Sequence, residues 1–231
     1  GYYADGGLTA GPDGLLYGMT LLGGVFEGGI IYSIDPVTEN FVSHHSFDTY
    51  DYGFPTGSLL LASNNKLYGM TAGIEDYDPG SLFEYDPATG VFETKVYLNQ
   101  PTGYFPAGVT LAEGSDHLLY GVTQGGGESG NGVLFSYDFN TETYNPVYHF
   151  DTGNNNGNVT LAADGNLYGI QFEANNIYKY AGPGNIDVIH SFSPDSLGRH
   201  PIGRLEADSA GMLWGITMEG GESGAGTIYS Y

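Results

Sequence analysis

Cysteine is absent from the sequence, cations are scarce, and apolar runs are only a handful of residues long. Without cysteine the chain has no disulfide, no thiolate zinc site and no cysteine nucleophile. Only 5 lysines and arginines stand against 27 aspartates and glutamates, which gives a formal net charge of −22. So few cations form no basic stripe for a phosphate backbone or an anionic lipid surface. The composition therefore excludes nucleic acid as a partner, and it predicts no docking on a membrane and no insertion into one.

Signatures of catalysis are also scarce. Residues 125–130 match the glycine spacing of a dinucleotide-binding loop, but no predicted helix follows them, and Glu128 stands where a phosphate would bind. The six histidines show none of the spacings of zinc proteases. We therefore predict no catalytic residue and no cofactor of this kind. The sequence opens at Gly1 with neither an initiator methionine nor a signal peptide, which indicates a processed or trimmed form.

A five-residue motif, Leu-Tyr-Gly-Met-Thr in its first copy, occurs five times along the chain. Its glycines are 51, 52, 48 and 46 residues apart, and such regular spacing is typical of a repeat protein. We expect each aromatic ring of the motif to pack against the following repeat, and each glycine to let neighbouring sheets approach closely. The aromatic and glycine positions are Tyr17 and Gly18, Tyr68 and Gly69, Tyr120 and Gly121, Tyr168 and Gly169, and Trp214 and Gly215.

Each repeat predicts four short strands. In the second copy these are residues 57–62, 66–71, 81–85 and 92–98, separated by turn-forming residues. The chain has 39 glycines and 11 prolines, and no helical periodicity persists over ten residues. Four strands in roughly 50 residues are typical of a β-propeller blade. The sequence thus predicts an all-β fold, a single five-bladed β-propeller domain over residues 1–231, with approximate repeats 1–50, 51–100, 101–150, 151–192 and 193–231.

The last repeat stops at residues 227–231, the end of its predicted third strand. We therefore expect the last blade to lack its outer strand within residues 1–231. An unpaired edge of this kind favours strand addition. Self-assembly through the last blade is accordingly one expectation for partners.

Further features of the repeat point to a family. Residues 45–47 and 190–192 are His-Ser-Phe, with the variant Tyr-His-Phe at 148–150, and Gly-Gly follows the motif in the first, third and fifth copies. In these features the whole chain resembles the GloVer-type tandem repeat of bacterial secreted and surface-anchored proteins. The resemblance implies an extracellular or cell-surface location and no particular activity. We expect His45, His149 and His190 to share one position on the outer strand and to serve the structure.

Two sets of loops on one face of the propeller are candidate binding surfaces, since loops on a rigid scaffold often carry function. Aromatic faces beside carboxylates suit sugars, which offer apolar C–H faces and hydroxyl groups. The alternative is that these are ordinary surface residues of an acidic protein. The glycine-rich loops between second and third strands hold Glu27, Glu75, Glu128, Glu173 and Glu222. The loops between repeats hold Tyr52, Phe54, Tyr104, Phe105, Arg199 and His200.

Calcium is a further candidate ligand. Asp76 and Asp78 place hard oxygen ligands close together in the second repeat. They do not match the twelve-residue loop of helix-flanked calcium sites, and the alternative is that both are simply solvated.

These observations favour a non-enzymatic extracellular module that binds or adheres to glycans or surface partners at several equivalent sites. A second hypothesis is a structural subunit of an extracellular filament or surface layer, joined through the open blade edge. A third is a five-bladed glycoside hydrolase. Such an enzyme needs one asymmetric set of carboxylates, whereas the acids of this chain recur at equivalent positions.

Overall fold

The computed structural model describes residues 1–4, 6–49, 53–73, 79–106, 108–152, 158–193 and 198–231. All 19 elements assigned in these residues are β-strands, and they form five antiparallel sheets. Within the same residues there is no helix that is long and apolar enough to cross a bilayer. The chain divides into two compact units, the N-terminal unit Gly1–Leu111 and the C-terminal unit Ala112–Tyr231.

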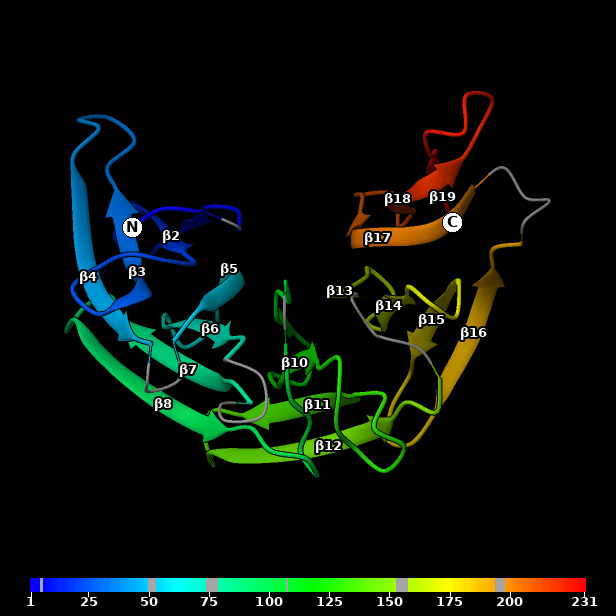
Figure 1. Cartoon of the computed structure of the whole chain (residues 1–231), viewed down its shortest axis with the longest axis horizontal. Coiled ribbons are helices and arrows are strands. Elements are labelled where there is room, and N and C mark those ends of the chain that lie inside the picture. The colour runs from blue at the N-terminus through cyan, green and yellow to red at the C-terminus, as the bar shows by residue number, and fades with distance from the viewer. Residues whose placement is uncertain (5, 50–52, 74–78, 107, 153–157, 194–197) are drawn as a thin grey trace. The chain divides into compact units, whose positions relative to one another are not determined.

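The N-terminal unit holds two four-stranded sheets, and in each the strands follow one another in chain order (Figure 1). Sheet 1 consists of β1 (Thr9–Ala10), β2 (Leu16–Thr20), β3 (Glu27–Ile34) and β4 (Phe41–Asp48). Sheet 2 consists of β5 (Pro55–Leu61), β6 (Leu67–Thr71), β7 (Ser81–Asp86) and β8 (Val91–Tyr97).

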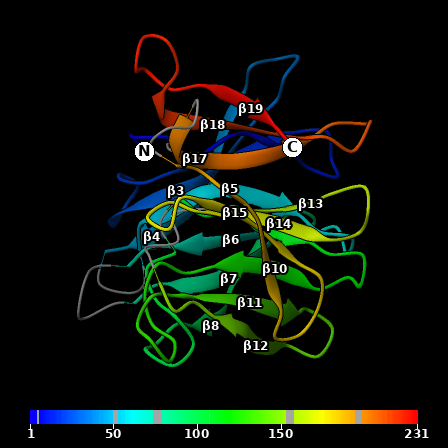
Figure 2. The same ribbon diagram turned by 90° about the vertical axis from the view of Figure 1, so that its right-hand side faces the viewer.

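The C-terminal unit holds the other three sheets. Sheet 3 consists of β9 (Ala112–Glu113), β10 (Leu119–Val122), β11 (Val133–Asp138) and β12 (Thr143–His149). Sheet 4 consists of β13 (Val159–Leu161), β14 (Leu167–Gln171), β15 (Asn176–Tyr180) and β16 (Ile186–Ser191). Sheet 5 has three strands in the described residues, β17 (Gly198–Ala207), β18 (Leu213–Gly220) and β19 (Ile228–Ser230), which lie side by side in Figure 2.

The all-β prediction and the four-stranded repeat are therefore confirmed, and the last sheet lacks a fourth strand in the described residues, as expected. The number of propeller blades and the single-domain boundary stay predictions. The five sheets coincide with the five copies of the motif, which forms the second strand of every sheet.

Turn chemistry explains why each sheet is a meander. Between the third and fourth strands an aspartate side chain accepts a backbone N–H two residues further on, which fixes the turn. Asp35 accepts the N–H of Val37 at 2.8 Å, and Asp86 accepts that of Ala88 at 2.8 Å.

The pairing of the third and fourth strands shifts register at the same position in four sheets, after Ile31, Leu82, Leu134 and Ile177.

The core lies between consecutive sheets. In the N-terminal unit Tyr17 and Met19 of sheet 1 form one buried cluster with side chains of sheet 2, among them Leu59 and Phe83. In the C-terminal unit the motif residues of sheet 4 cluster in the same way with Leu205 and others of sheet 5. The prediction that the motif aromatic packs against the next repeat is confirmed at these two junctions.

The role predicted for the motif glycine is wrong. A Cβ atom at Gly69 would overlap the ring of Phe83, and one at Gly169 would overlap Tyr178. Both rings belong to the third strand of the same sheet, where they are paired directly with the glycines. The glycine therefore makes room for an aromatic ring of its own sheet.

Gly69→Ala tests this explanation. We expect it to lower the free energy of unfolding by about 1–3 kcal/mol, because Phe83 is fully buried and must leave its position. Gly7→Ala is the matched control, since a Cβ there would lie 3.4 Å from its nearest neighbour, Ser58 Oγ. Thermal denaturation of both variants measures the difference, and equal effects would contradict the explanation.

Candidate functional site

The predicted loop acids lie at the surface. Glu128, Glu173 and Glu222 are exposed and lie between the second and third strands of sheets 3, 4 and 5. Glu27 is also exposed, but it is the first residue of β3 and has a left-handed backbone, with φ of 60°. Glu75 lies outside the described residues.

Phe54 and Phe105, which lie between repeats, form backbone hydrogen bonds near the start of the third strand of the preceding sheet. Phe54, Phe105 and His200 have φ of 65°, 52° and 55°, and each precedes a proline. The N–H of Phe54 donates to the carbonyl of Gly28 at 2.8 Å, and that of Phe105 donates to the carbonyl of Pro79 at 3.0 Å. These two bonds join the segments between repeats to the preceding sheet, whereas Arg199 and His200, predicted in such a loop, lie within strand β17. Tyr104 packs edge-on against Phe105 with ring centres 5.1 Å apart, and Tyr52 lies outside the described residues.

Arg199 and His200 gather around an acid that the sequence reasoning missed. Glu219 accepts Arg199 at 2.5 Å through one carboxylate oxygen, and its other oxygen lies 3.3 Å from His200 Nδ1. The His200 ring also stacks on Phe172 with centres 5.2 Å apart. Arg199 and Glu219 are directly paired across β17 and β18, so only the strand register could have revealed the contact.

The three outer-strand histidines do not share one position. His45 pairs with Ile31 and His190 with Ile177, which are equivalent residues of the third strand. His149 is offset by one residue and takes the place of Ser46. Ser46 and His149 make equivalent hydrogen bonds to the loop between the second and third strands. Ser46 Oγ accepts the N–H of Val25 at 2.8 Å, and His149 Nδ1 accepts the N–H of Glu128 at 3.3 Å. The structural role expected for His149 fits this bond.

A second recurring group joins the motif tyrosine to the turn between the first and second strands. Tyr17 donates its hydroxyl to Asp13 at 2.7 Å, and Tyr120 donates to Asp116 at 2.8 Å. The other oxygen of each aspartate accepts a backbone N–H two residues further on. Burial, followed by the bond to the aspartate, raises the pKa of Tyr17 well above its ordinary value. The signal in the sequence was an aspartate four residues before the tyrosine, which also occurs at Asp164 and Tyr168.

Two pockets of the C-terminal unit open at these turns. The first lies between sheets 3 and 4 and has a volume of about 200 Å³, and the second lies between sheets 4 and 5 with about 440 Å³. Both are built from the same repeat positions: a turn aspartate and motif tyrosine of one sheet, then a turn glycine, a leucine and a third-strand tyrosine of the next. These residues are Asp116, Tyr120, Gly165, Leu167 and Tyr180 in the first pocket, and Asp164, Tyr168, Gly211, Leu213 and Tyr231 in the second.

In the N-terminal unit the two corresponding tyrosines, Tyr17 and Tyr85, lie beside a third aromatic ring, that of His44. Tyr17 and Tyr85 have centres 6.1 Å apart, and the His44 ring lies 5.5 Å from each. Burial lowers the pKa of the His44 ring below its ordinary value. The junction between sheets 1 and 2 is thus more aromatic than those of the C-terminal unit.

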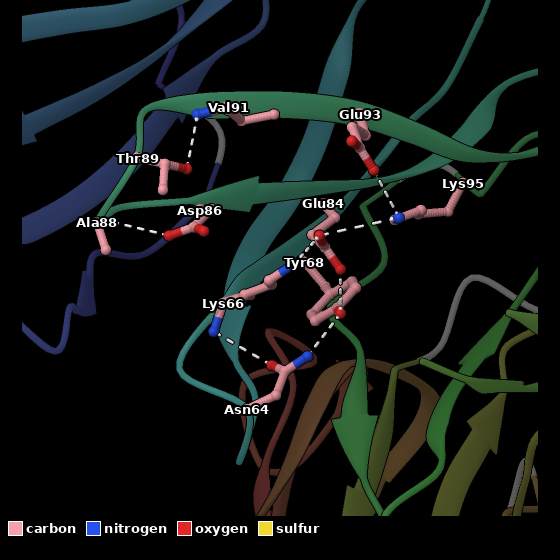
Figure 3. Close-up of polar contacts among 10 residues, drawn as sticks. All are labelled: Asn64, Lys66, Tyr68, Glu84, Asp86, Ala88, Thr89, Val91, Glu93 and Lys95. Carbon is pink, nitrogen blue, oxygen red and sulfur yellow. Dashed lines mark hydrogen bonds and ion pairs between the residues drawn. The ribbon is translucent and has the colours of Figure 1, made fainter. Parts of the chain in front are cut away.

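The second repeat departs from the pattern, and Figure 3 shows how. Asn64 replaces the turn aspartate and donates to the Tyr68 hydroxyl at 2.9 Å. Tyr68 in turn donates to Glu84, a carboxylate that is only 5% exposed. Lys66 Nζ lies 2.5 Å from Glu84 and Lys95 Nζ 3.9 Å, so two of the five cations of the chain neutralise this acid.

Glu84→Gln should lower the free energy of unfolding by about 1–3 kcal/mol, because it weakens the acceptor of a buried hydroxyl and removes the charge facing two lysines. Glu93→Gln is the matched control. Glu93 also pairs with Lys95, at 2.7 Å, but its side chain is 55% exposed, so little change is expected. Chemical denaturation of both variants checks this, and a Glu93 variant as unstable as the Glu84 variant would refute it.

The lowered pKa of Asp164 leads us to expect that the stability of the fold depends on pH. Burial acts to raise its pKa, but hydrogen bonds from Asn166, Tyr168 and Lys179 outweigh this and hold the pKa well below the ordinary value. A depressed pKa stabilises the fold above the unfolded value of about 4, and the contribution is lost as pH falls below it. The difference in thermal stability between the native chain and Asp164→Asn should therefore shrink on acidification. A constant difference from neutral to strongly acidic pH would disprove the assignment.

The calcium candidates Asp76 and Asp78 lie outside the described residues. In the rest of the chain, as far as the structure describes it, no group of three histidine, aspartate or glutamate side chains is arranged to hold a metal ion.

The fold resembles that of several solved bacterial structures. The extracellular domain of BT4673 from B. thetaiotaomicron, described as a one component system, matches with a TM-score of 0.70 and 18% identity over 100% of this chain. Virginiamycin B lyase from Staphylococcus aureus matches with a TM-score of 0.68 and 14% identity over 98% of this chain. The gluconolactonase XC5397 from Xanthomonas campestris matches with a TM-score of 0.61 and 13% identity over 93% of this chain. This chain spans 28% of the BT4673 chain, 69% of the lyase and 68% of the gluconolactonase.

At such low identity these likenesses establish the β-propeller fold and nothing about activity. No curated protein was found to match the sequence. A family model does match residues 3–229, almost the whole length, and it describes a repeat. The chain therefore belongs to the Gloeobacter/Verrucomicrobia repeat family.

Proposed function

We propose that this chain is a non-enzymatic extracellular module that binds polyhydroxylated ligands, such as glycans, at several equivalent sites. One observation carries the proposal: the C-terminal unit repeats one pocket at two junctions, each time from the same sequence positions. Weak sites repeated on one scaffold give avidity that a single site lacks. The likeness to an extracellular domain supports the proposed location.

The chemistry of the pockets suits a sugar. Each combines one carboxylate, which accepts hydrogen bonds from hydroxyl groups, with tyrosine rings that offer apolar faces. The smaller pocket, at about 200 Å³, equals roughly seven waters in liquid volume, which is the scale of one sugar ring. These pockets lie at the turn between first and second strands, at the opposite end of each sheet from the predicted loop acids. The proposal therefore moves the binding site away from Glu128 and Glu222.

Binding is favoured over hydrolysis by the number of acids. Glycoside hydrolases use a pair of carboxylates flanking the scissile bond. Among the described residues, each pocket has a single carboxylate in its lining, Asp116 or Asp164. The related folds include a lyase and a gluconolactonase, so release of product from a polysaccharide panel is the assay that separates this proposal from an enzyme.

The double variant Asp116→Asn/Asp164→Asn tests the binding site. Asparagine is compatible with the turn, because Asn64 occupies it in the second repeat and accepts the Lys66 N–H at 3.2 Å. We expect the variant to fold and to bind roughly tenfold more weakly or worse, since a hydrogen bond to a charged group contributes about 1.5–3 kcal/mol. Saturation-transfer NMR and calorimetry with methyl glycosides of glucose, galactose, mannose and fucose provide the measurement.

Asp138→Asn is the matched control. Asp138 also accepts backbone N–H groups in a turn of the C-terminal unit, but it does not line either pocket. Native affinity in the control and reduced affinity in the double variant support the proposal. Equal binding by all three proteins, or binding by none of them, would overturn it.

A further inference from the structure

A pocket of about 270 Å³ lies between sheets 1 and 2, and both of its walls belong to the N-terminal unit. Residues of the outer strands β4 and β8 line it, together with one residue of the loop between β2 and β3. Among these described residues four carry aromatic rings, one is an acid, and none is a lysine or arginine. The rings are Phe26, His45, Phe47 and Phe92, and the acid is Asp48. We call this site the aromatic pocket.

Three of the rings are held in place by the core. His45 and Phe92 stack face to face, with ring centres 3.7 Å apart and planes 9° from parallel. Phe47 stands edge-on to both, with its centre 4.8 Å from that of His45 and 5.4 Å from that of Phe92. Phe47 is 2% exposed and belongs to the buried cluster between sheets 1 and 2. Rings in two perpendicular orientations therefore border the aromatic pocket.

The fourth ring is positioned by the wall of the pocket itself. Ser46, which lies between His45 and Phe47 on β4, accepts the N–H of Val25 at 2.8 Å and that of Phe26 at 3.4 Å. These two bonds fix the backbone of the loop that carries Phe26. The strand that supplies two of the rings thus also places the fourth.

The repeat by itself does not require these rings. At the equivalent junction between sheets 3 and 4, Ser129 takes the place of Phe26 in the loop. In sheet 4, Ile186 takes the place of Phe92 and pairs with the third-strand tyrosine as Phe92 does. Two of the four rings are therefore absent where the same sheets pack in the same way, so core packing does not explain the full set.

Charge around the aromatic pocket favours a cation. Asp48 lines the pocket and is paired directly with Glu27 across β3 and β4, which places two carboxylates at this end of the sheet. The two lysines of the N-terminal unit, Lys66 and Lys95, both form ion pairs with Glu84. The chain as a whole carries a formal charge of −22, and such a field attracts cations.

The state of His45 is compatible with a bound cation. Burial lowers the pKa of its ring below the ordinary value, which favours the uncharged imidazole. An uncharged ring offers a π face to a cation, whereas a protonated ring would repel it.

We propose that the aromatic pocket binds a quaternary ammonium group, such as that of choline, with its methyl groups against the rings and its charge beside Asp48. Aromatic faces attract such cations, because the ring quadrupole is negative above the plane. Rings in perpendicular orientations suit a rounded group with methyls on every side better than the flat face of a sugar. The volume equals roughly nine waters in the liquid, which is enough for this group. The site lies in the other unit from the Asp116 and Asp164 pockets, and its ligand does not depend on glycan binding.

Three small probes separate the contributions of shape and charge. Choline carries both the methyl groups and the charge, 3,3-dimethylbutan-1-ol has the same shape without the charge, and ethanolamine has the charge without the methyl groups. Calorimetry and saturation-transfer NMR on the whole chain should show choline binding at least about tenfold more tightly than either of the others. A neutral alcohol that binds as well as choline means a plain apolar cavity, and an equal affinity for ethanolamine means attraction by charge alone. Either result, or no binding of choline, overturns the proposal.

Two further ligands distinguish the source of the quaternary ammonium group. Phosphocholine and glycine betaine carry the same group beside a negative charge, which the carboxylates of Asp48 and Glu27 would repel. We therefore expect both to bind more weakly than choline. Tighter binding of phosphocholine would indicate a phosphorylated headgroup and would contradict the role given to Asp48.

Phe26→Leu and Asp48→Asn test the pocket residues. Phe26→Leu keeps an apolar side chain but removes the ring, so choline should bind roughly fivefold more weakly while binding of the neutral alcohol stays as in the native chain. Asp48→Asn should weaken choline binding about tenfold, because it removes the charge beside the cation. Asparagine is compatible with this place, since Asn99 occupies it in the second repeat.

Each variant has a matched control. Val25→Ala changes the neighbour of Phe26 in the same loop, which is 81% exposed and does not line the pocket. Glu39→Gln removes one exposed acid from the turn that precedes β4, at the opposite end of the strand from Asp48. Both controls should bind choline like the native chain. Controls that lose as much affinity as the pocket variants would refute the assignment.

Discussion

Packing of one sheet on the next through the second strand is the interaction on which the rest of the structure depends. No sheet of this chain can bury both of its faces alone, so the stability of each repeat comes from its neighbour. The motif supplies what this contact needs: an aromatic ring and a methionine, valine or isoleucine on the face that meets the next sheet, such as Tyr17 and Met19. The intervening glycine allows the sheet to hold a second aromatic layer on its opposite face, where Phe83 lies over Gly69.

Burying a tyrosine in that contact requires a hydrogen-bond acceptor for its hydroxyl, and this acceptor lies in a surface turn. The ring is apolar, but its hydroxyl must find a partner. An aspartate in the nearest turn accepts it and also closes the turn, as Asp116 does for Tyr120. The same carboxylate then lines the pocket between sheets 3 and 4. A structural requirement thus places the same pair of aspartate and tyrosine in the pockets at successive junctions. In the second repeat the Tyr68 hydroxyl is bonded instead by Asn64 and Glu84, and two lysines lie near Glu84.

Much of this was visible in the sequence. Five copies of one motif, turn residues between short β-prone runs and the absence of helical periodicity led to an all-β fold of four-stranded units. The sites were harder to predict. Loop acids were singled out because they recur, whereas the aspartates that line pockets also recur and look like ordinary turn formers. The position of His149 was misjudged, since His149 pairs with Val133 and it is Tyr148 that takes the place of His45 on the outer strand.

The sequence by itself determined the local features: where strands begin and end, which turns join them, and which side chains alternate onto which face of a sheet. These depend on residues close together in the chain, so spacing reveals them. Only the tertiary structure decided which faces are buried and which polar groups meet. Glu84 contacts Tyr68 and Lys66, and Glu219 contacts Arg199 and His200, through pairings between strands. The exposure of Trp214, at a position that buries its equivalents, is likewise a property of neighbouring sheets and not of the motif.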